Sequence, residues 1–356
     1  MMSEISAQLV KQLREMTDAG MMDCKKALVE VNGDLEKAVQ YLREKGLSKA
    51  AKKADRVAAE GIISVEVSKN FSKASLVEIN SETDFVAKND NFKDLVAKTT
   101  SLIFDKSVND TKDLQNLQID SAPFDEYLKT QIAKIGENII VRRIKSIQAQ
   151  SSVLVNGYVH FNGRVGVLIS ASFANSTNKD KIAEFVRNLC MHAAAMKPTV
   201  LDYSGFSKEF LDKECVALAA EIEKENEELK RLKKPLKNIP EFVSKAQITD
   251  EVLAKQEQKI KENLAKQGKP ESIWDKIIPG QLERFIADNT LIDQRLTLLG
   301  QFYVLDDKKT IAQVLQEKSK ELNDNIKILE YVRFELGEGI EKKEENFADE
   351  VLAQMK

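Results

Sequence analysis

At 356 residues the chain is too long for one small hydrophobic core, so two or more domains are expected. Its 54 basic and 57 acidic side chains give a formal net charge of −3, so no global field attracts nucleic acid. Cys24, Cys190 and Cys215 stand far apart, which argues against a disulfide framework or a zinc site. With neither a signal-peptide pattern nor an apolar run of membrane-spanning length, the sequence predicts a cytoplasmic protein without a membrane contact.

Residues 1–55 predict a bundle of three short helices, similar in size and pattern to ubiquitin-associated domains. Apolar residues of the first helix recur at helical spacing, and Ser3 can cap it. A second helix is expected from about Met22 to Val31, and Asp34 can cap a third that stops at Lys45-Gly46. The basic residues that follow predict a solvated helical linker. A nucleic-acid patch is disfavoured there because no aromatic residues are interleaved.

Residues 56–150 predict the first half of an α+β core. Strands are expected at Ile62–Val67 and Ala74–Ile79, and a further strand within Gly136–Arg143. Helices are expected at Phe92–Ile103 and Phe124–Ile135. The stretch between these two helices is rich in Asn, Asp, Thr, Ser and Pro, and an irregular excursion is predicted there.

The connection between the first strand pair and its helix holds an unusual apolar pair, Phe85-Val86, set between Asp84 and Lys88. One interpretation is a helix N-terminus, with Thr83 or Asp84 as the cap and Phe85 as a staple onto the core. The other is an exposed aromatic side chain that contacts a partner protein. Spacing alone favours the staple.

The same strand–strand–helix pattern returns in residues 151–206 and 290–336, the second half of the core. Asn162-Gly163 between two strands is typical of a type I′ hairpin turn, and a helix from about Lys179 to Met196 follows. We interpret the two halves as a duplication. Each half has too few strands to bury a sheet face alone, so two small antiparallel sheets are expected to pack on each other.

Residues 207–289 interrupt the second half with a Lys- and Glu-rich helical insertion. Its apolar residues from Leu211 to Leu232 follow an alternating 4-3 seam that misses only at Glu225, which is a heptad pattern. Prolines end this helix, and a second helix returns from about Asp250 to Gln267. An ordinary helical hairpin packed on the body is the alternative, but the narrow seam favours a projecting coiled-coil arm.

After the insertion, a helix from Thr310 to Leu322 and a strand at Tyr331–Leu336 close the core. Residues 337–356 predict a C-terminal module, a short amphipathic helix with Phe347, Val351 and Leu352, which packs on the body or reaches a partner. The predicted fold class is therefore α+β, with a three-helix bundle, a duplicated core, a helical insertion and a C-terminal helical module.

The sequence carries no recognisable motif for covalent chemistry. Gly337-Glu338-Gly339 lacks the third glycine of a dinucleotide fingerprint, and no GxxxxGK[ST] loop exists, so a nucleotide hydrolase is not predicted. The two histidines, His160 and His192, are too few for a relay or a metal site. His192 lies on an apolar helix face, where a packed core role is favoured. We expect no cofactor, no metal and no enzymatic activity.

Five motifs, in order along nearly the whole chain, resemble the signatures of the elongation factor Ts family, the bacterial guanine-nucleotide exchange factors of translation. They are Leu13–Leu28, Asn80–Asn89, Ile135–Ile139, Met191–Pro198 and Arg333–Lys342. The resemblance implies binding to elongation factor Tu in its GDP form, release of GDP by disturbing the Mg²⁺ and phosphate site, and continued binding until GTP binds.

The resemblance also implies roles for single residues. Thr83, Asp84, Phe85 and Val86 match the segment that displaces Mg²⁺ from the partner. The implied partner contacts are Arg14, Met21, Met22, Ile135, Gly136 and His192. The methionines beside Gly20 fit either a small core or a docking surface. Direct nucleic-acid binding is not expected, and a homodimer or a 2:2 complex with the partner is left open. A scaffold without exchange activity is the alternative function.

Overall fold

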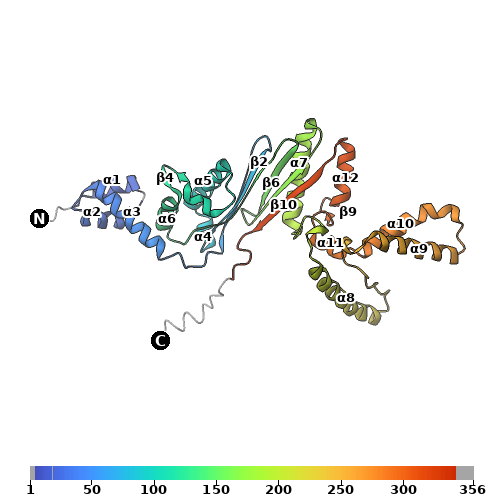
Figure 1. Cartoon of the computed structure of the whole chain (residues 1–356). Coiled ribbons are helices and arrows are strands. Elements are labelled where there is room, and N and C mark those ends of the chain that lie inside the picture. Colours follow the sequence, from blue (N-terminus) through green and yellow to red (C-terminus); the bar gives the residue numbers. More distant parts are fainter. Residues whose placement is uncertain (1–4, 18, 342–356) are drawn as a thin grey trace. The chain divides into compact units, whose positions relative to one another are not determined.

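The computed structural model describes residues 5–17 and 19–341 of the chain (Figure 1). The chain divides into two compact units. The first holds residues 1–172, 179–194 and 332–356, and the second holds residues 173–178 and 195–331. None of the described helices combines the length and apolar character that crossing a bilayer requires. The finer division of the chain into five domains stays a prediction.

Three helices form the predicted N-terminal bundle: α1 (Ala7–Thr17), α2 (Met21–Glu30) and α3 (Leu35–Ala51). Leu13 and Leu28 are fully buried in its small core, together with Cys24, Ala27 and Ala38. Ser3 lies outside the described residues, and the side chain of Ser6 accepts a hydrogen bond from the Leu9 amide at the start of α1. The Asp34 side chain caps α3 as predicted, because it accepts from the Lys37 amide at 3.1 Å.

The predicted stop at Lys45-Gly46 is wrong, because α3 continues to Ala51. Gly46 instead faces helix α6 (Phe124–Ile135), where a Cβ on Gly46 would lie 3.4 Å from the Cβ of Ala133. Arg43 of α3 also pairs with Glu126 of α6. The glycine therefore allows two helices to pack closely, and this packing joins the bundle to the core.

The first sheet has the strand order β1-β2-β5, with β1 (Glu60–Val67), β2 (Lys73–Ser81) and β5 (Ile140–Gln148) antiparallel. Helices α5 (Asp90–Lys106) and α6 pack on it. Their shared core includes Val77, Ile79, Phe92, Leu95 and Ile103. The connection between α5 and α6 holds a 3-10 helix (Thr111–Asn116) and the two-residue strands β3 (Gln118–Ile119) and β4 (Ala122–Pro123).

The second sheet repeats this arrangement. Its order is β10-β7-β6, with β6 (Val153–His160), β7 (Val165–Ser172) and β10 (Lys327–Glu335). In both sheets a hairpin is followed by a helix, here α7 (Lys179–Met196), and a later strand joins the second strand of the hairpin. This repetition agrees with the predicted duplication.

The turn between β6 and β7 differs from the predicted type I′ turn. Pairing ends at His160 and Val165, so four residues form the loop, and Phe161, Asn162 and Gly163 all have positive φ angles. The Gly163 carbonyl accepts a hydrogen bond from the Ile63 amide at 2.7 Å. The wider turn thus reaches strand β1, a contact that the local sequence does not reveal.

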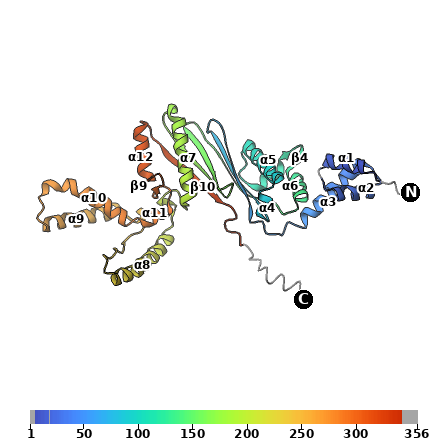
Figure 2. The same ribbon diagram turned by 180° about the vertical axis from the view of Figure 1, so that it is seen from behind.

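The two sheets face each other inside the first unit, and α7 lies on the side opposite α5 and α6 (Figures 1 and 2). Ile63, Leu76 and Ile147 of the first sheet pack there with Val155 and Leu168 of the second. Gly166 lies at the closest approach: a Cβ on it would be 2.5 Å from side-chain atoms of Ile63 and Leu76.

Replacing Gly166 with alanine is expected to lower the free energy of unfolding by about 1–3 kcal/mol, because an added methyl group overpacks the space between the sheets. Urea denaturation followed by circular dichroism measures this loss. The matched control is Gly280→Ala in α10 (Trp274–Asp288), where an added Cβ meets nothing within 4 Å. The control is expected to be neutral or stabilising. Equal stability of Gly166→Ala and the wild type would contradict the proposed sheet contact.

The second unit holds the helical insertion. Its helices are α8 (Lys208–Arg231), α9 (Asp250–Lys266), α10 and α11 (Leu291–Leu296), with 3-10 turns at Lys245–Gln247 and Glu271–Ile273. Seam residues Leu211, Leu218 and Ile222 of α8 pack with Val243 and Ile292. Ile260 and Leu264 of α9 pack with Ile278 of α10. The closest helix pair of the insertion is therefore α9 with α10.

The remainder of the second unit is short. It includes 3-10 helices at Ser176–Asn178 and Tyr203–Gly205, strands β8 (Phe302–Tyr303) and β9 (Asp306–Thr310), and helix α12 (Ile311–Glu321). Thr310 and Gln313 form a capping box that starts α12 close to its predicted position. The predicted C-terminal helix with Phe347, Val351 and Leu352 lies outside the described residues.

Candidate functional site

The residues Thr83–Val86 lie at the end of β2 and in the one-turn helix α4 (Asp84–Ala87). Thr83 is the cap, since its side chain accepts from the Val86 amide at 3.4 Å. Val86 packs against the first-sheet core, whereas Phe85 is 79% exposed. The staple interpretation of Phe85 is therefore wrong. Consecutive residues of a helix point about 100° apart, and here Val86 faces the core while Phe85 points into solvent.

The loop that carries Phe85 is braced by a second predicted motif. Glu137 accepts hydrogen bonds from the Thr83 amide at 3.0 Å and from the Thr83 hydroxyl at 2.5 Å. In the opposite direction, Glu82 accepts from the Asn138 amide at 2.6 Å. Charged acceptors make these bonds stronger than ordinary ones. The structure thus brings Asn80–Asn89 and Ile135–Ile139 together, and it adds Glu82 and Glu137 as positioning residues that the sequence interpretation did not single out.

The basic linker also takes part in this bracing. The Asn138 side chain donates to the Arg56 carbonyl at 2.8 Å, and Lys53 donates to the Gly136 carbonyl. Arg56 pairs with Glu82 at 3.4 Å. The expectation of a merely solvated linker is corrected by these contacts, because residues 53–56 help to fix the loops that present Phe85.

Ile135 and Gly136 end helix α6 beside this loop. Ile135 is half-buried against the first-sheet core. Gly136 is exposed with φ 96°, and its amide donates to the Ile132 carbonyl at 2.9 Å. A positive φ favours glycine at a helix C-terminus, so the residue has a local structural role in addition to its predicted contact. Its exposed backbone lies next to the braced loop.

Asp84 forms an exposed ion pair with Lys88, with 2.7 Å between its carboxylate and Nζ. The hydrogen bond from Lys88 lowers the pKa of Asp84 below its usual value. Lys88 also lies 5.9 Å from the centre of the Phe85 ring. Because its pKa is lowered, the Asp84 carboxylate is ionised at neutral pH. Exposed ion pairs are weak, so another cation can replace Lys88 at little cost in free energy.

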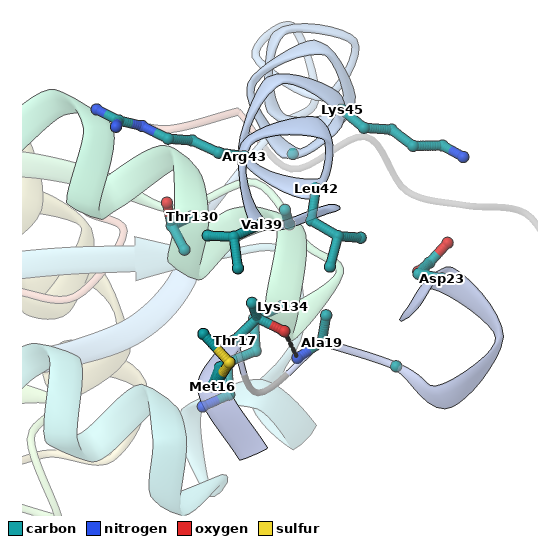
Figure 3. A pocket seen from close by; sticks show the side chains of 13 residues that line it. Met16, Thr17, Ala19, Asp23, Val39, Leu42, Arg43, Lys45, Thr130 and Lys134 are labelled. Carbon is teal, nitrogen blue, oxygen red and sulfur yellow. Dashed lines mark hydrogen bonds between the residues drawn. The ribbon is translucent and has the colours of Figure 1, made fainter. Parts of the chain in front are cut away.

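The predicted contacts of the N-terminal bundle lie at its surface. Arg14 is exposed, and Met21 and Met22 are 60% and 64% exposed, so these methionines are not core residues. Beside them a groove of about 450 Å³ runs between the α1–α2 turn, α3 and α6. Figure 3 shows Val39 and Leu42 of α3 facing this turn. The bundle therefore presents flexible apolar side chains to solvent, as a docking surface does.

His192 is fully buried on the apolar face of α7, which confirms its packed position. Its side chain does not reach the surface of the described structure, so the partner contact implied for His192 stays a prediction that would need α7 to rearrange. His160 lies beside the hairpin, with its Nδ1 2.9 Å from the Tyr158 hydroxyl.

The Gly337-Glu338-Gly339 segment has a structural role at the first sheet. The fully buried Glu78 carboxylate accepts from the Gly337 amide at 2.9 Å, and it pairs with Arg142 at 3.0 Å and Arg143 at 2.5 Å. Because the Gly337 amide is occupied by this carboxylate, the segment does not form a phosphate-binding loop. Among residues 5–17 and 19–341, no group of three potential metal ligands is found.

These observations describe two exposed features of the first unit. One is the loop with Phe85 and Asp84, which is braced by carboxylate–amide hydrogen bonds, and the other is the N-terminal bundle with Met21 and Met22. Such a site can change the conformational preference of another protein by binding it, which requires no bond to be made or broken.

Comparison with known proteins identifies the family. The family model for elongation factor Ts matches residues 82–239 and 237–338. Elongation factor Ts of Wolinella succinogenes is 68% identical over 354 residues, which are 99% of this chain and 100% of that protein. The Helicobacter hepaticus protein is 66% identical over 99% of this chain and 100% of its own length, and the Helicobacter pylori strain J99 protein is 65% identical over 100% of both chains. The chain therefore belongs to the elongation factor Ts family of translation elongation factors.

Proposed function

We propose that this protein is a guanine-nucleotide exchange factor that binds elongation factor Tu in its GDP form, promotes release of GDP and stays bound until GTP binds. Membership of the elongation factor Ts family supports elongation factor Tu as the partner. The observation that carries the mechanism is the 79% exposed Phe85 on a loop braced from Thr83 to Glu137. A large aromatic side chain held in solvent by strong hydrogen bonds is ready to enter a pocket on another protein.

Exchange requires differential binding. The factor must prefer the nucleotide-free form of its partner over the GDP form, and each tenfold loss of GDP affinity takes about 1.4 kcal/mol of that preference. Burial of Phe85 supplies roughly 1.5–3 kcal/mol. This amount corresponds to about one to two powers of ten. The flanking contacts must supply the remainder.

Asp84 adds a charge effect to the insertion of the Phe85 ring, which we call the wedge. Thr83, Asp84, Phe85 and Val86 together are proposed to disturb the Mg²⁺ and phosphate site of the partner. In the free protein Lys88 neutralises Asp84. When the ion pair opens at the partner, the ionised carboxylate attracts Mg²⁺ away from the GDP phosphates. Without this attraction, Mg²⁺ screens the negative charge of the phosphates. Val86 remains in the core and holds α4 in place.

The other predicted contacts are proposed to supply affinity. Arg14, Met21 and Met22 in the bundle of residues 1–55 would hold the partner, while Ile135 and Gly136 extend the contact beside Phe85. For His192 an indirect role, through the packing of α7, fits its burial better than direct contact. The core halves (56–150; 151–206 with 290–336), the insertion (207–289) and the C-terminal module (337–356) are proposed as the remaining domains, in a cytoplasmic protein.

The deciding experiment mixes the protein with elongation factor Tu that carries fluorescent GDP and follows release by stopped flow. We expect release to accelerate with factor concentration until it saturates. The alternative, a scaffold without exchange activity, predicts a stable complex with an unchanged release rate. Light scattering on the same complex distinguishes a 1:1 from a 2:2 assembly, which is a separate matter from exchange.

A further inference from the structure

The end of helix α8 and the loop after it carry an unusual concentration of positive charge. All ten residues from 230 to 239 are exposed, and we refer to this segment as the basic tip. It contains Lys230, Arg231, Lys233, Lys234 and Lys237 and no acidic residue. The formal charge of the whole chain is −3, so an average over the molecule conceals this local reversal.

The basic tip has a defined backbone. Lys233 adopts φ 53°, a left-handed conformation that usually favours glycine, and the Lys234 amide donates to the Leu229 carbonyl at 2.9 Å. Asn226 then fastens the loop to α8. Its side chain accepts from the Lys237 amide at 2.7 Å and donates to the Lys237 carbonyl at 2.8 Å. These bonds hold the chain in a fold that projects its lysines into solvent.

Most of these charges lack a carboxylate partner. Within the part of the chain that the structure describes, only Lys237 of the five forms an ion pair, with Glu225 at 2.7 Å. Glu227 and Glu228 lie one turn earlier on α8 and weaken the positive potential along the helix. The field is therefore strongest in the last turn and the loop, where several positive side chains can each approach a separate anion.

We propose that the basic tip binds the phosphate backbone of double-helical RNA. Closely spaced, unpaired cations match a polymer with regularly spaced phosphates, and binding releases the counterions condensed on that polymer. The exposed Leu232 and Leu236 between the cations, and Ile239 after the last of them, can contact sugars in the wide, shallow minor groove of A-form RNA. The tip has no aromatic side chain on which an unpaired base could stack, so a duplex suits it better than a single strand.

An anionic membrane surface is the competing class of partner. Segments that lie in a membrane interface generally carry a continuous apolar helical face with aromatic anchors. The tip instead interrupts its three apolar residues with lysines and Pro235, and its helix ends at Arg231. These features favour RNA. The inference goes beyond the exchange function and does not depend on it, since neither Phe85 nor the N-terminal bundle belongs to the tip.

The test uses the full-length protein and a fluorescent RNA duplex of about 16 base pairs, a length that spans successive minor grooves. Fluorescence anisotropy is measured over a series of salt concentrations. If four cations neutralise four phosphates, the logarithm of the association constant should fall against the logarithm of salt with a slope of about −3.6. The variant K230Q/R231Q/K233Q/K234Q should lose at least about tenfold in affinity at low salt, and its slope should approach zero.

Two matched variants make the result specific. K255Q/K259Q/K261Q/K266Q removes the same number of charges from exposed positions of α9, and it should bind RNA within about twofold of the wild type. E227Q/E228Q should bind about two- to fivefold more tightly, because it removes the negative charges beside the tip. Circular dichroism confirms folding, and GDP release from elongation factor Tu, unchanged in all three variants, separates this proposal from the exchange function.

Three outcomes would overturn the proposal. RNA affinity of the tip variant equal to that of the wild type would exclude the tip as the binding site. An equal loss in the α9 variant would show that net charge alone is responsible. Tip-dependent co-sedimentation with vesicles containing anionic phospholipid, without RNA binding, would assign the tip to a membrane surface.

Discussion

Phe85→Ala is expected to slow catalysed GDP release by about tenfold or more at saturating factor, with the fold intact. The side chain is 79% exposed, so its removal costs the free protein little stability. The loss falls on the complex, where the ring leaves an apolar pocket on the partner unfilled. Because the braces from Glu137 to Thr83 remain, the loop keeps its position and only the wedge is lost.

Stopped-flow release of fluorescent GDP from elongation factor Tu measures this effect. Phe161→Ala is the matched control, since Phe161 is also a strongly exposed aromatic residue of the first unit but lies in the β6–β7 turn. The control should exchange at the wild-type rate. Asp84→Ala should also slow release by about tenfold, though less than Phe85→Ala, which removes more buried area. A folded Phe85→Ala protein that releases GDP at the wild-type rate would refute the proposal that Phe85 acts by entering a pocket on the partner.

The double substitution Met21→Ala and Met22→Ala is expected to weaken association with elongation factor Tu by about one to two powers of ten, while release at saturating factor stays near the wild-type rate. Both side chains are exposed in the free protein, so their replacement should not disturb the core of Leu13, Cys24 and Leu28. Burial of two methionines in the complex supplies binding free energy that does not distinguish the GDP form from the nucleotide-free form.

The half-saturating concentration and the saturating rate must therefore be measured separately. The control is Val216→Ala on α8, where the side chain is 73% exposed and lies outside the bundle. If the methionine variant lowered the saturating rate and left the half-saturating concentration unchanged, the bundle would take part in exchange itself. The proposed division of labour between affinity and exchange would then be wrong.

Local sequence signals predicted most secondary structure because they act within a few residues. Helices α6 (Phe124–Ile135) and α7 (Lys179–Met196) have the expected bounds, since apolar periodicity ends there close to a helix breaker, Gly136 or Pro198. The failures involve distant partners. The local sequence predicts a helix stop at Gly46, but its neighbour Ala133 lies far along the chain, and the Asn162-Gly163 turn is wider than predicted and contacts Ile63.

The candidate site shows the same limit. The signature motifs single out Thr83–Val86, but spacing favours Phe85 as the residue that enters the core, whereas Val86 packs there. The two residues are both apolar and adjacent, so the local pattern does not distinguish them. The reciprocal bonds that involve Glu82 and Glu137 join residues more than 50 positions apart. No local pattern encodes such a contact. The basic tip is not apparent from the net charge, because net charge averages over regions of opposite sign.

The contacts of the buried Glu78 carboxylate can form only in a fixed order during biosynthesis. Glu78 leaves the ribosome early, whereas its backbone donor Gly337 follows 259 positions later. At about 5–20 residues per second, this interval lasts roughly 13–50 s. During that time the nascent first sheet holds a carboxylate whose ligand set is incomplete, with Arg142 and Arg143 as its early partners. The Gly337 amide thus completes the contacts of Glu78 only after the 259 intervening positions have been synthesised, and a chain interrupted before Gly337 lacks this hydrogen bond.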